Sequence, residues 1–199
     1  MTVPYELTGR TNQKARTRDA LIAATRELLA EGVVPTMEGA AAAASVSRTT
    51  AYRYFPNTAA LIAAAYPHVE QRSLLGQDPP QEPAARLQIV AENHTRRILD
   101  NEPEMRAVLR LSLQGVRPSE LPMHRGLRIA WIEDALAALR GRLPEDELQR
   151  LIHGIGATLG IEAFVWLTDV AGLPREQAAA TIRSNALALL RAATGNHAT

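Results

Sequence analysis

Apolar residues recur at intervals of three and four along most of the chain, which is the period of an amphipathic helix. The first such run begins near Ala15, continues through Leu21, Ala24 and Leu28, and ends at Gly32. Proline and glycine separate the later runs. Their apolar faces are Leu87, Val90, His94 and Ile98; Met105, Leu109 and Leu113; Ile129, Ile132, Leu136, Leu139 and Leu143; Leu148, Leu151, Ile152, Ile155 and Leu159; and Ile182, Ala186, Leu189 and Leu190. The pattern predicts an all-α protein, and the run from Leu148 is expected to continue as one helix to Val170.

Between the first run and the later ones lie two short helical segments. Thr36 is a suitable N-cap for a helix that extends to about Ala44. A second helix is predicted over residues 48–54 after a break at residues 45–47, and Ser47 can cap it. Asn57 is a suitable N-cap for a third helix that starts at Thr58. Two short helices with a three-residue break have the dimensions of a helix-turn-helix unit, whose second helix enters the major groove of DNA.

The second short helix has one apolar side. Ala51 and Phe55 are four residues apart and are expected to face the core, because positions with this spacing share one side of a helix. Arginine can form two hydrogen bonds with guanine, and threonine and tyrosine can bind phosphate or a thymine methyl group. The side chains left to face outward are Arg48, Thr49, Tyr52 and Arg53.

Composition narrows the picture further. Aromatic residues make up 4 % of the chain and its net charge is +1, so any contact with nucleic acid must come from a local patch. The chain has no cysteine, which excludes disulfides and thiolate chemistry. We find no signal-peptide pattern and no uninterrupted apolar run near the roughly 18 residues that a membrane span needs. We therefore expect a cytoplasmic protein with no membrane partner.

No arrangement of residues is typical of an enzyme. The chain has no Gly-rich phosphate loop after a strand and no serine in a strand-to-helix elbow. The histidines lack the spacing of metal ligands, and they are His68, His94, His124, His153 and His197. We expect no catalytic residues, no metal and no cofactor.

The segment from Thr36 to Phe55, TMEGAAAAASVSRTTAYRYF, resembles the helix-turn-helix motif of the TetR (tetracycline-repressor-like) regulators. The matching residues are Thr36, Ala41, Ala44, Val46, Ser47, Thr50, Tyr52, Tyr54 and Phe55. The resemblance implies that Thr36, Ser47, Thr50 and Tyr54 hold phosphates. It also implies that Arg48, Thr49, Tyr52 and Arg53 read bases, with Glu38 near the groove.

Three residues depart from the TetR pattern. Ala40 replaces a large aliphatic residue, which reduces packing between the first helices. Ser45 replaces the glycine of the turn, where a left-handed backbone costs a residue with a Cβ atom about 1 kcal/mol. Thr58 replaces a lysine that reaches phosphate in many members. None of the three removes the recognition surface.

The resemblance implies a homodimer that binds a palindromic operator in double-stranded DNA, and we expect a repressor that a small-molecule effector releases. The expected domains are a flexible arm over residues 1–14, a DNA-binding domain over 15–56, and a ligand-binding and dimerisation body over 57–199. The helix at 57–66 would be the hinge, as the single connection between head and body. Two alternatives stay open: a helical protein-interaction module, and a DNA-binding dimer without an effector.

Several side chains in the body have two interpretations. His94, Trp131, Phe164 and Trp166 either fill the core or line an effector pocket. Arg110 belongs either to a surface ladder with Glu102 and Arg106 or to an anion site.

Gly154, Gly156 and Gly160 interrupt a helical pattern at a cost of about 1 kcal/mol each. They either permit close approach of a partner helix, bend their own helix or make room for a ligand. The dimer interpretation adds Ile182 and Leu189, because the stretches 145–171 and 174–193 match the dimer helices of TetR-like proteins. The basic residues of the arm either lie along DNA or are solvated; they are Arg10, Lys14, Arg16 and Arg18.

Overall fold

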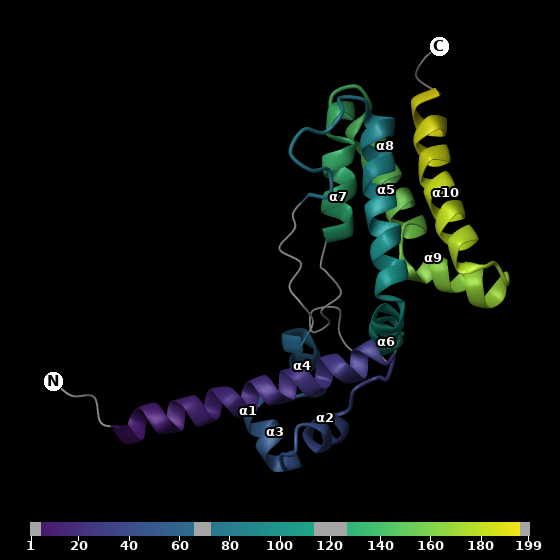
Figure 1. Cartoon of the computed structure of the whole chain (residues 1–199). Helices are drawn as coiled ribbons and strands as arrows, with labels where there is room; N and C mark the ends of the chain where they lie inside the picture. Colours follow the sequence, from purple (N-terminus) through teal and green to yellow (C-terminus); the bar gives the residue numbers. More distant parts are fainter. Residues whose placement is uncertain (1–4, 66–72, 114–126, 196–199) are drawn as a thin grey trace. The chain divides into compact units, whose positions relative to one another are not determined.

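The computed structural model describes residues 5–65, 73–113 and 127–195 (Figure 1). In these ranges the regular elements are helices, with one isolated bridge between Arg140 and Leu143, so the all-α prediction is confirmed. The chain divides into two compact units. The first consists of Met1–His68 and Arg106–Met123, and the second of Val69–Met105 and His124–Thr199. The turn expected at residues 115–122 and the stop expected at Pro67 lie outside the described residues.

The first unit is built on three short helices and one long one. These are α1 (Tyr5–Ala30), α2 (Met37–Ala43), α3 (Arg48–Tyr54) and α4 (Thr58–Ala65), together with most of α6 (Glu102–Leu113). The predicted caps are present: the side chains of Thr36, Ser47 and Asn57 accept backbone N–H groups of Gly39, Thr50 and Ala60. The largest side chains of the shared apolar core are Leu21, Ile22, Leu29, Met37, Phe55, Leu61, Ile62 and Leu111.

Helix α1 begins at Tyr5, so the prediction of a start near Ala15 is wrong. Its side chains at 13–20 are exposed except for half-buried Thr17, and the next residue, Leu21, is buried. Polar residues such as Gln, Lys and Arg favour a helix nearly as well as Leu does. Because this part of α1 buries no side, it carries no apolar period by which the start could be recognised.

Helix α6 packs through a different side from the one predicted. The sequence suggested Met105, Leu109 and Leu113, but Leu113 is 79 % exposed and the other two are half-buried. The side chains in the core of the first unit are those of Ala107, Val108 and Leu111. Both sets have helical spacing, and the smaller Ala107 lets the helix approach the core closely.

The second unit consists of helices packed on one another. They are α5 (Pro83–Asp100), α7 (Leu127–Ala135), the 3-10 turn η1 (Ala137–Leu139), α8 (Glu145–Thr158), α9 (Ile161–Val165), the π-helical turn η2 (Trp166–Val170) and α10 (Arg175–Gly195). Helix α10 packs against α5 and α8, and α7 against both of these (Figure 1). The predicted apolar side of α5 is confirmed, because Leu87, Val90, His94 and Ile98 are all buried.

The helix expected to reach Val170 is interrupted. Helix α8 ends at Thr158, and Gly160 has an extended backbone with φ −142° and ψ 173°. The segments on either side meet at 45°. Of the interpretations of these glycines, the bend is therefore present at Gly160. No single helix in the described part is long and apolar enough to cross a membrane; α8 and residues 161–170 reach that length and composition only as a bent pair.

The turn between α2 and α3 ends α2 with a Schellman motif. The Val46 N–H donates to the Ala41 carbonyl at 2.9 Å and the Ser45 N–H to the Ala42 carbonyl at 3.0 Å. This geometry gives Ser45 a φ of 55°, in the left-handed region. Glycine occupies that position in most such motifs, since it has no Cβ atom to crowd the backbone. The strain predicted at this departure from the family pattern is therefore present.

Ser45→Gly should raise the free energy of unfolding, because it removes the left-handed strain. The gain is about 0.5 kcal/mol, since the roughly 1 kcal/mol of relieved strain is partly offset by the greater freedom of glycine in the unfolded chain. Urea unfolding followed by circular dichroism measures it. Ser45→Ala is the matched control: it retains the Cβ atom and should bring no gain. A stabilised alanine variant would show that strain at residue 45 is not the cause.

Candidate nucleic-acid interface

The burial of one side of α3 determines which side chains it presents. Ala51 is fully buried and Phe55, which caps the helix, is 4 % exposed; both lie in the core of the first unit. The opposite side of the helix is at the surface, as the four-residue spacing predicted. The exposed side chains there are Arg48, Thr49, Tyr52 and Arg53.

Two hydroxyl groups fix the starts of α2 and α3. The Thr36 hydroxyl oxygen accepts the Gly39 N–H at 3.0 Å, and the Ser47 hydroxyl accepts the Thr50 N–H at 3.1 Å and donates to the Thr50 hydroxyl at 2.9 Å. A hydroxyl that accepts can still donate its own proton. Thr36 and Thr50 therefore each have a proton available for a phosphate oxygen, while the Ser47 proton is already used.

Arg48 is held by two neighbours. Its Nε lies 2.8 Å from Glu38 Oε1 on α2, and its guanidinium lies 5.5 Å from the centre of the Tyr52 ring. The contact with Tyr52 and then the charge of Glu38 raise the pKa of Arg48. Both partners of the ion pair are more than half exposed, so water screens their attraction and the pair contributes little to folding. Its effect is to determine where Arg48 lies before DNA arrives.

Arg53 and Tyr54 are adjacent and differ in exposure. The Arg53 guanidinium lies 5.5 Å from the centre of the Tyr54 ring and is exposed, whereas Tyr54 is half-buried and packs against the core. The core also contains Ala40, fully buried at the position where the family has a larger residue. Thr58 begins α4 and is half-buried.

The candidate ligand residues of the body do not all come together. Trp131 and Phe164 are buried in the second unit, whereas Trp166 is 57 % exposed. Arg110 belongs to the first unit and donates to the Gly32 carbonyl at 3.1 Å. It cannot be assigned to a pocket with the others. Glu102, expected in a ladder with Arg106 and Arg110, pairs with Arg175 at 2.7 Å.

His94 is a buried imidazole with one nitrogen unused. Its ring centre lies 5.5 Å from that of Trp131, and its Nδ1 has no hydrogen-bond partner among the described residues. Burial, followed by the charges of Arg128 and Arg97, lowers the pKa of His94 to about 3, against weaker opposing effects of Glu162 and a hydrogen bond with the Leu159 backbone. The ring is therefore neutral at pH 7, and its Nδ1 can accept a hydrogen bond.

Next to His94 an ion pair crosses Gly160. Arg128 Nη1 lies 2.9 Å from Glu162 Oε2, and Arg128 Nη2 lies 3.1 Å from Glu162 Oε1. Burial raises the pKa of Glu162, but the hydrogen bonds and charge of Arg128 outweigh it and lower the pKa. A Cβ atom at residue 160 would lie 1.6 Å from Arg128 Nη1. Sequence reasoning missed this pair, because the partners are far apart in the chain and neither lies in a motif.

The residues proposed for a dimer interface lie in different environments. Gly156 and Ile182 are buried within the chain, and a Cβ atom at Gly156 would lie 3.0 Å from Ile129 of α7. Gly160 is covered by the ion pair, so the close approach that these glycines permit is made within one chain. Leu189 is 37 % exposed, and a Cβ atom at Gly154 would meet nothing within 4 Å.

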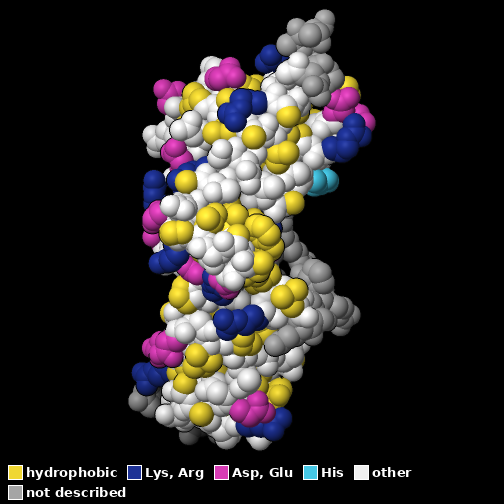
Figure 2. Space-filling view, turned by 90° about the vertical axis from the view of Figure 1, so that its right-hand side faces the viewer, with side chains coloured by type: hydrophobic (Ala, Val, Ile, Leu, Met, Phe, Trp, Pro, Cys, Tyr) yellow, Lys and Arg dark blue, Asp and Glu magenta, His cyan; other side chains and the backbone are white. Residues whose placement is uncertain are grey.

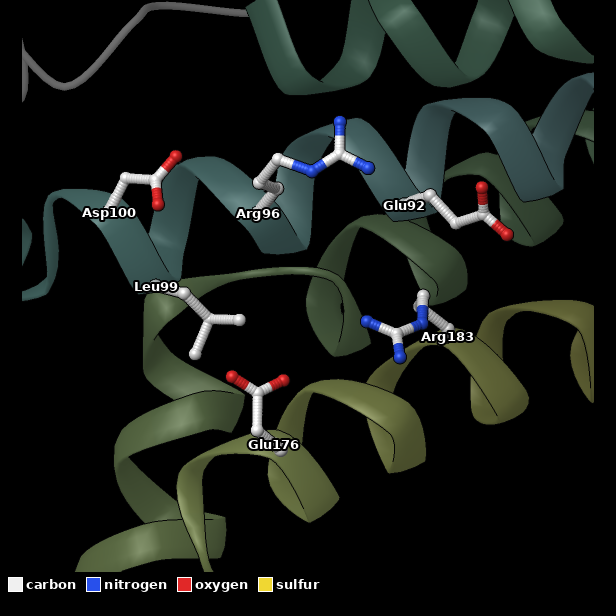
Figure 3. A pocket seen from close by; sticks show the side chains of 6 residues that line it. All are labelled: Glu92, Arg96, Leu99, Asp100, Glu176 and Arg183. Atoms are coloured by element: carbon white, nitrogen blue, oxygen red, sulfur yellow. The ribbon is translucent and has the colours of Figure 1, made fainter.

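A groove of about 470 Å³ lies between α5 and α10 and contains none of the candidate ligand residues. In Figure 3, Glu176 and Arg183 on α10 lie opposite residues of α5. Arg183 donates to the Thr95 hydroxyl at 3.1 Å and Arg96 to the Asn93 side chain at 3.3 Å, so both guanidinium groups already have partners. The lining is Glu92, Arg96, Leu99, Asp100, Glu176 and Arg183.

The helix-turn-helix unit also has relatives. The family model described as bacterial regulatory proteins, tetR family, matches residues 21–65, which include α2, α3 and α4. A TetR transcriptional regulator from Rhodococcus sp. RHA1 has a similar crystal structure, with a TM-score of 0.52 and 24 % identity over 89 % of this chain and 96 % of that chain. At this identity the similarity concerns the fold. No curated protein matches the chain.

The outward side of α3, on a unit of this fold, defines a DNA-binding transcriptional regulator of the helix-turn-helix class. The match over residues 21–65 identifies this segment as a DNA-binding domain of the tetR type, within a chain whose fold is similar to that of a TetR regulator. The individual residues that contact DNA stay a prediction.

Glu38→Gln should strengthen binding to duplexes of any sequence, because it removes a carboxylate next to Arg48 on the exposed side of the motif. The free energy of unfolding should change by less than about 0.5 kcal/mol, as expected for an exposed pair. Fluorescence anisotropy with random-sequence duplexes measures the affinity. Glu31→Gln, an exposed carboxylate beyond the end of α1, is the control. Equal effects of both substitutions would assign the change to net charge alone.

The low pKa of His94 predicts a loss of stability in mild acid. Below pH 6.5 the unfolded chain protonates this imidazole while the folded protein, with a pKa of about 3, does not. The unfolded state then binds more protons, so stability falls as pH falls through this window, by about 1.4 kcal/mol between pH 7.5 and 5.5. Urea unfolding of the wild type and His94→Phe at both pH values isolates this contribution from that of the carboxylates. Equal losses in the two proteins would contradict it.

Proposed function

We propose that the protein is a homodimeric repressor that binds a palindromic operator through α3 and is released by a small molecule. The observation that supports DNA binding is that α3 exposes Arg48, Thr49, Tyr52 and Arg53. Its opposite side is held in the core by the buried Ala51 and Phe55. Two copies of α3 would enter successive major grooves about 34–36 Å apart. The hydroxyl groups of Thr36 and Thr50 would bind phosphates, and Arg48 and Arg53 would read base edges.

The second copy is proposed to pack against the second unit. Large apolar side chains are exposed there: Trp166 is 57 % and Val170 is 70 % exposed, in addition to Leu189 on α10. Figure 2 faces the side on which Figure 1 draws α10, and hydrophobic side chains gather on it. Exposed apolar side chains that gather together are typical of an interface. Leu189 stays in the proposed dimer interface. Gly154 is proposed for that interface in place of Gly156 and Gly160.

The effector is proposed to bind beside His94 in the second unit. Buried polar atoms nearly always have a hydrogen-bond partner, so the unused Nδ1 requires an explanation. A small molecule that donates a hydrogen bond there would meet the Trp131 ring, over which the Arg97 guanidinium lies 5.5 Å from the ring centre. The open groove between α5 and α10 is the weaker candidate, because its guanidinium groups already donate to the side chains of Asn93 and Thr95.

Helix α6 is proposed to carry the signal between the units. Its first residues belong to the second unit, where Glu102 pairs with Arg175, and Ala107, Val108 and Leu111 are buried in the core of the first. The expectation that the helix at 57–66 is the single connection is therefore wrong. An effector acts only through its difference in affinity for the two states of the dimer. A displaced start of α6 would favour the state in which the heads cannot reach successive grooves.

The two alternatives make different predictions. A helical protein-interaction module would use the motif for protein contacts and would not retard DNA at low salt. A DNA-binding dimer without an effector would leave the buried Nδ1 of His94 without a partner among the described side chains. The unused nitrogen therefore favours the effector-responsive regulator over the second alternative.

Selection of binding sites from random oligonucleotides tests the proposed function. We expect a site with twofold symmetry and half-sites about one helical turn apart. Arg48→Ala should weaken binding to that site by about 1–3 kcal/mol and relax the preference at one base of each half-site. Recovery of no preferred sequence, with no retardation at low salt, would reject DNA binding and favour the interaction module.

Leu189→Glu should convert the dimer into a monomer, because a charge placed in an apolar interface loses its hydration. Sedimentation equilibrium should give twice the chain mass of 21.6 kDa for the wild type and the chain mass for the variant. Val33→Glu introduces the same charge at an exposed apolar position of the first unit and should leave the dimer intact. A dimeric Leu189→Glu variant would place the interface elsewhere.

A further inference from the structure

The N-terminal part of α1 is a helix that buries none of its side chains between residues 13 and 20. In Figure 1 it extends beyond α2, α3 and α4 of the same unit. Between Glu6 and Asp19 the sequence contains no acidic residue. None of the basic side chains at 14, 16 and 18 forms an ion pair within the described part of the chain.

One contact orients this segment relative to α3. The Arg18 guanidinium lies 5.5 Å from the centre of the Phe55 ring, and Phe55 caps the C-terminal end of α3. The side of α1 that carries Arg18 therefore faces α3. Lys14 is four residues earlier and lies on the same side, one turn farther from the core. Arg16 is two residues from each of them, which places it about 200° around the helix, on the other side.

The charge pattern favours a polyanion as the partner. Lys14 and Arg18 repel each other weakly at a spacing of four, and no carboxylate within the described part of the chain relieves this. The continuity with α3 points to the same duplex that α3 enters. A run of phosphates that follows the DNA backbone away from the major groove would offset the charge.

We propose that the side of α1 with Lys14 and Arg18 is a second DNA contact, which binds backbone phosphates next to the bases that α3 reads. This proposal rests on the proposed DNA binding by α3. The contact adds affinity without sequence preference, because phosphates carry no base information.

The composition of the chain provides a direct test. Lys14 is its single lysine, so an amine-selective reagent modifies only Lys14 and the N-terminal amine. The full-length protein is treated with an N-hydroxysuccinimide acetate ester, free and bound to its selected duplex, and Lys14 modification is quantified by mass spectrometry. We expect DNA to lower the modification of Lys14 several-fold and high salt to remove this protection. Unchanged modification in a complex shown to be intact would overturn the proposal.

A matched pair of variants measures the contribution to binding. Lys14→Gln should make the dependence of log affinity on log salt less steep, by about 0.9 for each phosphate that Lys14 neutralises in a subunit. Arg16→Gln removes the same charge from the other side of the helix and should leave the slope nearly unchanged. Equal changes in the two variants would overturn the proposed contact in favour of diffuse attraction.

Duplex length supplies a further control. The effect of Lys14→Gln should disappear on a duplex trimmed to the bases that α3 reads, since the flanking phosphates are then absent. Persistence of the effect on the trimmed duplex would overturn the placement. If the wild type binds no duplex, the proposed function itself fails; if it binds normally and Lys14 has no effect, only this second contact fails.

Discussion

The arrangement of the motif depends on the contact that holds α3 to its core. Ala51 and Phe55 are buried, and this fixes the rotation of a helix only seven residues long. A helix of that length is not stable by itself, so packing and the Ser47 cap maintain it. Because those two side chains face inward, the two arginines must face outward. The same burial brings Phe55 under Arg18 of α1.

How much the sequence could predict varied with the physical origin of each feature. The caps at Thr36, Ser47 and Asn57 were predictable, because capping depends on a few adjacent residues. The left-handed backbone of Ser45 was also predictable, since any residue at that position of the turn adopts this conformation. The start of α1 and the packed side of α6 were not. The exposed start of α1 has no apolar period that would mark it. In α6, two sets of apolar residues have helical spacing, and the sequence does not show which set faces a neighbouring helix.

The candidate site in the body shows a similar division. The helical period predicted that His94 lies on the apolar side of α5, and it is buried there. The unused Nδ1 and the Arg128–Glu162 pair arise from tertiary packing between distant segments, which leaves no local signal. Three aromatic residues that the sequence analysis treated together, as core or pocket residues, differ in burial. Trp131 and Phe164 are inside, whereas Trp166 is at the surface and is better suited to a partner.

The ion pair between Arg48 and Glu38 has a consequence for how a regulator of this kind would find its site. On DNA of arbitrary sequence Arg48 can stay with Glu38, and the hydroxyl groups and other cations hold the phosphates. The protein then remains free to slide, because no base-specific bond has to be broken at each step. Only a correctly placed guanine offers Arg48 two hydrogen bonds in exchange. In the proposed function, the pair would separate a fast search along DNA from slower, base-specific binding.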